Sequence, residues 1–138
     1  SFIILKTSTN KIILDTVIDN IFKLVDAVIQ KNKKLIFNTY KKLVSDKEEP
    51  AVIISLLANN IMLILECSIL LNEGMSSKDI ASKLKEHPYR VSLAINNSYK
   101  VKKEELIDNL NKLAELDYQI KTGEVDKFKG LEAYFINL

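Results

Sequence analysis

The chain contains few of the residues that build disulfides, metal sites and phosphate-binding loops. Its 138 residues include one Cys, one His, three Gly, two Pro and no Trp. The lone Cys67 cannot form an internal disulfide, so we expect a reducing compartment, the cytoplasm. A structural zinc site needs four Cys or His ligands, and the chain offers two. Three scattered glycines also exclude the glycine-rich loops that cradle phosphates.

An excess of charge of one sign is also missing. Twenty basic and eighteen acidic residues give a net charge of +2, which is far from the basic excess of a dedicated nucleic-acid-binding domain. Residues 1–74 and residues 75–138 are each nearly neutral, so no charged tail is hidden in the average. The charge balance therefore fits packing against other proteins better than binding in a DNA groove.

A catalytic constellation is not visible in the sequence either. Cys67 could act as a nucleophile only with His87 as its base, and a single Cys is more often a small buried apolar residue. The carboxylates are spaced as on solvated helix faces. We therefore predict that the chain is not an enzyme and that it holds no catalytic, cofactor-binding or metal-binding residue.

Apolar residues recur at helical spacing along most of the chain, and its length suits a single domain. No convincing strand pattern occurs, and only residues 2–5 suggest a short extended piece within an irregular opening. We predict an all-α fold, a helical bundle of about seven helices with a long central helix. Their approximate limits are residues 21–29, 35–44, 50–72, 76–84, 87–97, 102–122 and a last helix from residue 126.

Residues with known preferences at helix ends support these limits. Asp19 or Asn20 is a candidate N-cap of the first helix, and Asn32 is a candidate N-cap of the second. Pro50 has the fixed backbone angle that suits the first position of the third helix. Gly74 is placed to end that helix in the left-handed conformation. The residues that favour helix ends therefore lie where the apolar periodicity predicts that the helices begin and end.

The helix predicted over residues 50–72 is the longest, and it is apolar on nearly every side. Sixteen of the 21 residues from 51 to 71 are apolar, so a membrane span has to be considered. Asn59, Asn60 and Glu66 lie inside this run, and a carboxylate at the centre of a membrane helix costs about 2.5–3.5 kcal/mol. We therefore favour the central helix of a bundle.

Residues 76–97 contain a pattern typical of a helix-turn-helix, in which two short helices meet through a tight turn. The second helix of such a unit enters the major groove of DNA. Against this interpretation, the turn position that is often Gly is Lys85, and the second helix offers only Arg90 and the terminal Lys100 as cations. The alternative hypothesis is thus a DNA-binding regulator that uses residues 76–97.

A series of short motifs resembles a known family. Together the motifs resemble the C-terminal region of the bacterial DNA polymerase III delta subunit, a component of the clamp loader, over about residues 16–138. The pair HPYRV and LDYQIKTG is the most specific part of the resemblance. In chain order the motifs are IFKLVDAV (21–28), EEP (48–50), LLNEG (70–74), IASKL (80–84), HPYRV (87–91), LDYQIKTG (116–123) and LE (131–132).

The resemblance implies a clamp-loader collar domain at residues 16–138, preceded by a remnant of another domain or a linker at residues 1–15. Such a domain packs against the gamma/tau and delta-prime subunits and holds the loader ring together, so that the sliding clamp is loaded on DNA during replication. It implies that the sliding clamp is bound only by an N-terminal part not contained in these residues, that DNA is contacted indirectly, and that no membrane or cofactor is involved. The full-length protein would be a subunit of a DNA-directed DNA polymerase holoenzyme, a transferase, although this chain itself is not catalytic.

The motifs also supply candidate interface or structural residues. We expect His87 at a cap position and Pro88 at the start of a helix in which Tyr89, Val91 and Ile95 pack. The full set of candidates is His87, Pro88, Tyr89, Arg90, Asp117, Lys121, Gly123 and Glu132.

Three of these candidates allow a more specific prediction. Arg90 is the only Arg in a Lys-rich chain, and its planar fork can make contacts that Lys cannot. We predict that Arg90 makes a specific carboxylate or carbonyl contact, within the bundle or to a neighbouring subunit; the alternative is a solvated helix residue. Asp117 and Lys121 stand four residues apart on one helix and are expected to pair. The chain departs from the family pattern at Asn59, Asn60 and Met62, where relatives often carry Arg and Gln.

Overall fold

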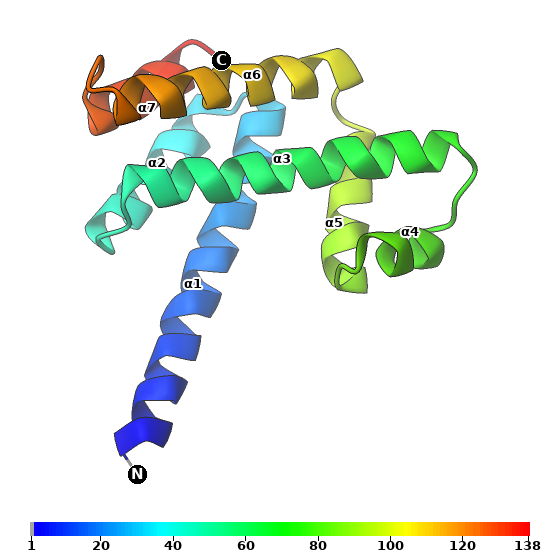
Figure 1. Cartoon of the computed structure of the whole chain (residues 1–138), viewed down its shortest axis with the longest axis horizontal. Coiled ribbons are helices and arrows are strands. Elements are labelled where there is room, and N and C mark those ends of the chain that lie inside the picture. The colour runs from blue at the N-terminus through cyan, green and yellow to red at the C-terminus, as the bar shows by residue number, and fades with distance from the viewer. Residues whose placement is uncertain (1) are drawn as a thin grey trace.

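Seven α-helices and no strand make up residues 2–138, the part of the backbone that this computed structural model describes, and side chains are described for residues 16–138. The long α3 crosses the middle of the molecule, with α6 and α7 along one side of it and α4 and α5 near its C-terminal end (Figure 1). The all-α class and the number of helices are therefore confirmed. The helices are α1 (Phe2–Gln30), α2 (Lys33–Ser45), α3 (Pro50–Asn72), α4 (Ser77–Leu84), α5 (Pro88–Ser98), α6 (Lys103–Lys121) and α7 (Lys127–Ile136).

The first helix is where the prediction from sequence is wrong. The irregular opening and the extended piece at residues 2–5 are helical, because α1 begins at Phe2. Asp19 and Asn20 lie inside this helix and do not cap it. Residues 2–30 contain no Pro or Gly, and each residue added to an existing helix gains a backbone hydrogen bond, so nothing local ends the helix earlier. The predicted boundary between residues 15 and 16 falls within α1 and stays a prediction.

The other helix ends follow the residues that favour them. The side chain of Asn32 accepts a hydrogen bond from the Leu35 amide at 3.2 Å, and Pro50 is the first residue of α3. Gly74, with φ of +90°, follows the end of α3, and its amide donates to the Leu71 carbonyl at 2.9 Å. These ends turn the chain sharply, so that helices α1, α4, α5, α6 and α7 all contact α3.

The central position of α3 explains its unusual composition. Among the described residues it is the one helix that is long and apolar enough to cross a membrane. In this fold its apolar side chains pack instead against the five helices that contact it. The buried residues of α3 are Pro50, Ile53, Ile54, Leu57, Ile61, Leu63, Ile64, Leu65, Cys67 and Leu70.

Candidate functional site

The residues of the α4–α5 corner restrict the backbone conformation of the chain between the two helices. Lys85 ends α4 in the left-handed conformation, with φ of +54°, at the turn position where Gly is common. Nδ1 of His87 accepts a hydrogen bond from the Tyr89 amide at 3.0 Å, and Pro88 is the first residue of α5. The predicted cap at His87 and helix start at Pro88 are therefore confirmed. The corner presents α5 to α3 and α1 in one orientation.

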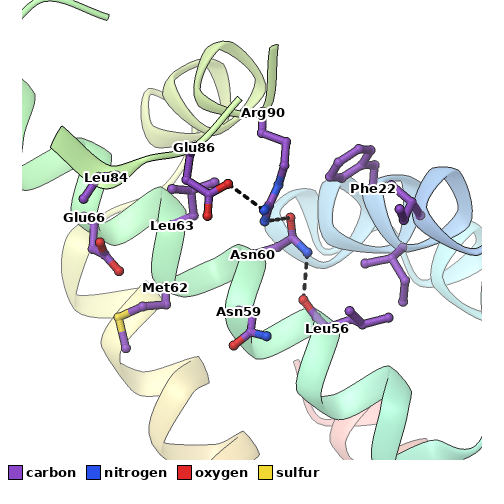
Figure 2. Close-up of a pocket in the computed structure, with 12 residues that line it drawn as sticks. Phe22, Leu56, Asn59, Asn60, Met62, Leu63, Glu66, Leu84, Glu86 and Arg90 are labelled. Carbon is purple, nitrogen blue, oxygen red and sulfur yellow. Dashed lines mark hydrogen bonds and ion pairs between the residues drawn. The ribbon is translucent and has the colours of Figure 1, made fainter. Parts of the chain in front are cut away.

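Arg90 connects this corner to α3. Its Nη1 donates to Oε2 of Glu86 at 2.8 Å, and its Nη2 donates to Oδ1 of Asn60 at 3.4 Å (Figure 2). Asn60 is held in turn, because its Nδ2 donates to the Leu56 carbonyl at 2.8 Å. The predicted carboxylate contact of Arg90 is confirmed, and it lies within the bundle.

Asn97 connects the same helix to α1. It is 95% buried, and its Nδ2 donates to Oδ1 of Asp26 at 2.8 Å. Arg90 and Asn97 are two of the few polar side chains that a DNA-reading α5 could use, and both are engaged inside the domain. The arrangement gives no support to the alternative of a DNA-binding regulator.

The predicted packing of Tyr89 is wrong, because its side chain is 63% exposed. Residues two apart on a helix point to nearly opposite sides, so Tyr89 and Val91 cannot face the same core. Val91 and Ile95 are buried, as predicted, and they take the core side of α5. Tyr89 lies instead at the rim of a hollow of about 240 Å³ between α1 and α5.

One face of α3 is left uncovered by the other helices. Val52 and Met62 are each 43% exposed, and Ile69 is 36% exposed. They recur at helical spacing with three polar residues, and we call this set the α3 open stripe: Val52, Ser55, Asn59, Met62, Glu66 and Ile69. At 1.5 Å per residue the stripe is about 25 Å long. Apolar side chains therefore continue beyond the surface that this chain itself buries.

A hollow flanks the open stripe on each side. The corner hollow, of about 410 Å³, lies between α1, α3 and the α4–α5 corner, and Glu86 and Arg90 line it (Figure 2). The α6 hollow, of about 420 Å³, lies between α3 and α6, and Asp117 and Lys121 line it. Asn59 and Met62 border both hollows. The open stripe is thus a ridge with a depression along either side.

The remaining candidate residues divide between this surface and other places. Nζ of Lys121 pairs with Oδ2 of Asp117 at 2.6 Å, as predicted, beside the α6 hollow. Gly123 follows the end of α6 with φ of +79°, a backbone conformation that favours glycine at the end of a helix. Glu132 is exposed on α7 and lines neither hollow beside the stripe. The structure therefore brings Arg90, Asp117 and Lys121 to one surface and leaves Glu132 elsewhere.

The partners of the polar links are not among the residues predicted from the sequence. Glu86 stands four residues before Arg90, so the spacing of helical ion pairs could have found it. Asn60 and Asp26 lie 30 and 71 residues from their partners, and no local pattern connects them. The polar residues Ser55, Asn59 and Glu66 recur at helical spacing and could have marked the exposed face of α3, although most of this helix is apolar.

The described side chains of the open stripe and its two hollows are suited to packing against another protein. No group of three or more His, Cys, Asp and Glu side chains that could hold a metal ion occurs among the side chains the structure describes. Burial, with smaller contributions from the Glu66 and Glu86 carboxylates, raises the pKa of the Cys67 thiol to about 11. The thiol is therefore protonated at neutral pH, which makes it a poor nucleophile.

Comparison with known proteins places this arrangement among replication proteins. Residues 18–138 match the family described as DNA polymerase III delta subunit, C-terminal domain. The chain is 35% identical over 119 residues to DNA polymerase III subunit delta of Bacillus subtilis strain 168, which covers 86% of this chain and 34% of that protein. The fold matches the solved Bacillus subtilis DNA clamp loader delta protein with a TM-score of 0.83 at 34% identity, over 87% of this chain and 35% of that one. The chain thus spans about a third of the relatives it matches.

Proposed function

Because this chain belongs to the family of C-terminal domains of the DNA polymerase III delta subunit, we propose that it is a non-catalytic assembly domain of a clamp loader. In this proposal the domain joins the delta subunit to the other subunits of the loader ring, so that the ring can place a sliding clamp on DNA. The observation that carries the proposal is the match of the whole helical domain to a clamp loader delta protein, at a TM-score of 0.83.

The proposal extends to partners and location. The gamma/tau and delta-prime subunits are the partners of the domain, in the cytoplasm. Contacts with the sliding clamp belong to a part of the full-length protein outside this chain, and DNA is reached only through the assembled loader. The full-length protein is in this view a subunit of the DNA polymerase III holoenzyme, a transferase whose chemistry takes place in other subunits.

The physical features of the domain support an assembly role. Its net charge of +2 gives little general attraction for DNA. Its central helix exposes Val52, Met62 and Ile69 along one face, and exposed apolar residues gathered on one face mark surfaces that bind other proteins. The proposed role needs surface of this kind and needs no perturbed catalytic group.

The test uses the full-length protein that contains this chain, expressed with the loader subunits and the sliding clamp of the same organism. We expect the full-length protein to co-elute with the gamma/tau and delta-prime subunits in size-exclusion chromatography. A variant that lacks residues 16–138 should fail to join them. The truncated variant should still bind the isolated sliding clamp, which controls for its folding. Assembly of the truncated variant at the full-length level would contradict the proposal.

A further inference from the structure

We infer that the α3 open stripe and its two flanking hollows form the seat for an amphipathic helix of a neighbouring clamp-loader subunit, with a Lys or Arg of that helix paired to Glu66. This inference rests on the proposed assembly function and adds the surface and the chemistry of the partner.

The first argument is the gathering of exposed apolar side chains on one helix face. Val52, Met62 and Ile69 share one face of α3, although α3 is the helix that five others contact. Single exposed apolar residues are common on protein surfaces and need no explanation. Among the described side chains, no other helix exposes more than two large apolar residues: Ile107 and Tyr118 on α6, and Phe128 and Ile136 on α7. Together with Ser55, Asn59 and Glu66, which lie between them, the three apolar residues of α3 form one stripe of about five turns, a length that a partner helix can follow.

The second argument is shape. The open stripe is a ridge, and the corner hollow and the α6 hollow lie along its two sides with volumes of about 410 and 420 Å³. Helices pack by placing side-chain ridges of one into grooves of the other. A helix laid along the stripe can place side chains in both hollows while its own groove receives Met62. Roughly 17 residues of partner helix would span the distance from Val52 to Ile69.

The third argument is charge. In the corner hollow Arg90 is paired with Glu86, and in the α6 hollow Lys121 is paired with Asp117. Glu66 is half-buried and has no hydrogen bond or ion pair to any side chain in the described residues 16–138. The surface therefore carries one uncompensated charge, and it is negative. A cation on the partner would complete the pairing and fix the position of the helix along the stripe.

The same charge argues against a second copy of this chain as the occupant. A symmetric dimer would place the same patch on both partners, so the stripe would face itself. The stripe itself contains no Lys or Arg, and the two cations of the flanking hollows, Arg90 and Lys121, are already paired with Glu86 and Asp117. Another loader subunit, with a helix that is apolar on one face and carries a cation, satisfies both requirements.

The experiment compares single substitutions in the full-length protein, reconstituted with the loader subunits of its own organism. Met62→Asp is expected to weaken association with those subunits at least about 30-fold, as measured by titration in analytical chromatography or interferometry. Leu35→Asp is the matched control, because Leu35 is 37% exposed on α2, away from the stripe. It should associate like the wild type. Both substitutions are at exposed positions, and unchanged melting temperatures will show that each variant folds.

A second variant tests the charge independently. Glu66→Gln should weaken association by about 3- to 10-fold and should reduce its dependence on salt, because the pair that salt screens is lost. Wild-type protein that fails to join the loader would refute the proposed function itself. Wild-type protein that joins, with Met62→Asp joining equally well or Leu35→Asp equally impaired, would overturn this inference alone. Loss of a wild-type homodimer by Met62→Asp, with loader assembly unchanged, would also overturn it.

Discussion

The two ends of the helical bundle are held by different kinds of interaction. At one end, which we call the aromatic end, α2 and α7 lie near the start of α3 (Figure 1). These two helices contribute an aromatic cluster, defined here as Phe37, Tyr40, Tyr134 and Phe135. The ring of Phe135 lies 5.3–6.1 Å from the other three, and Phe135 is fully buried. At the other end, which we call the polar end, Arg90 joins α5 to Asn60 in the middle of α3, and Asn97 joins α5 to Asp26 of α1.

The difference separates stabilisation from orientation. Burial of aromatic rings contributes a large free energy but has weak directional preference. Hydrogen bonds contribute less net free energy and depend on distance and angle, so they specify how one helix lies against another. The aromatic end is therefore expected to dominate the stability of the domain, whereas the polar end determines how α5 lies against α3 and α1.

The largest expected effect is at the aromatic end. Phe135→Ala should lower the free energy of unfolding by about 3–5 kcal/mol, because it removes a fully buried ring and leaves a cavity among three other rings. Denaturant titration of the domain, within the protein that contains it, measures this change. The control is Phe128→Ala on the same helix, which removes a ring that is already 37% exposed and should cost much less. Equal losses for the two variants would contradict the importance given to the aromatic cluster.

A smaller effect is expected at the polar link between α5 and α1. Asn97→Ala should cost about 1–3 kcal/mol, because it removes the donor to the half-buried Asp26 carboxylate. Asn96→Ala, at the exposed neighbouring position, is the control and should change stability by less than about 0.5 kcal/mol. Amide hydrogen exchange should show faster opening of α5 in the Asn97 variant while α7 keeps its protection. Equal acceleration in both helices would show that the two ends are not distinct.

The Arg90 contacts should contribute less again. Arg90 and Glu86 are each about one-third exposed, with 33% and 31% of their side chains accessible, so water screens their attraction. A double-mutant cycle with Arg90→Ala and Glu86→Ala should give a coupling free energy of about 0.3–1 kcal/mol. Arg90→Lys keeps the charge and should lose part of this stability, since Lys cannot contact Glu86 and Asn60 with two nitrogens of one planar group. If Arg90→Lys changes neither the stability of the domain nor its affinity for partners, the planar guanidinium group of Arg90 has no specific role.

Prediction from sequence worked best where the determining residues are local. Asn32, Pro50 and Gly74 each set a helix end within a few residues, and the structure confirms them. The beginning of α1 differs from the prediction of an irregular opening, although the segment contains β-branched residues that favour strands. Their preference is weak, and without Pro or Gly it does not stop a helix that continues into a packed one.

The candidate surface was less accessible to sequence analysis. The Glu86–Arg90 and Asp117–Lys121 pairs have helical spacing, so both could be anticipated. These two pairs lie on the two sides of one face of α3 because of how α5 and α6 pack against it. Arg90 and Asp117 are more than 25 residues apart in the chain, so no local pattern connects the two pairs. The apolar pattern of α3 identified a helix that must be buried, but it does not distinguish burial within the chain from burial against a partner.

The smallest effect at neutral pH is expected at a buried hydroxyl in the aromatic cluster that has no hydrogen-bond partner among the described side chains. The Tyr134 hydroxyl donates to Oδ1 of Asn109 at 3.2 Å, whereas the buried Tyr40 hydroxyl has no hydrogen-bond partner among the described side chains. Tyr40→Phe keeps the ring against Phe135 and removes only this hydroxyl. Its free energy of unfolding should stay within about 0.5 kcal/mol of the wild type at pH 7, or rise slightly.

The free energies of unfolding of Tyr40→Phe and the wild type should differ more at alkaline pH than at neutral pH. Burial, together with the nearby Glu132 and Asp126 carboxylates, raises the pKa of Tyr40 from 10 to about 12. Because the folded protein holds this proton more tightly than the unfolded chain, the stabilisation is complete below pH 10 and is lost as the pH rises from 10 through 12. Tyr40→Phe removes this dependence, so its advantage over the wild type should grow by about 1 kcal/mol between pH 10 and pH 11. Tyr99→Phe, at a position 75% exposed, should follow the wild type throughout. Parallel curves for all three proteins would show that Tyr40 titrates like a solvated tyrosine, and the aromatic end would then be more open to water than its burial indicates.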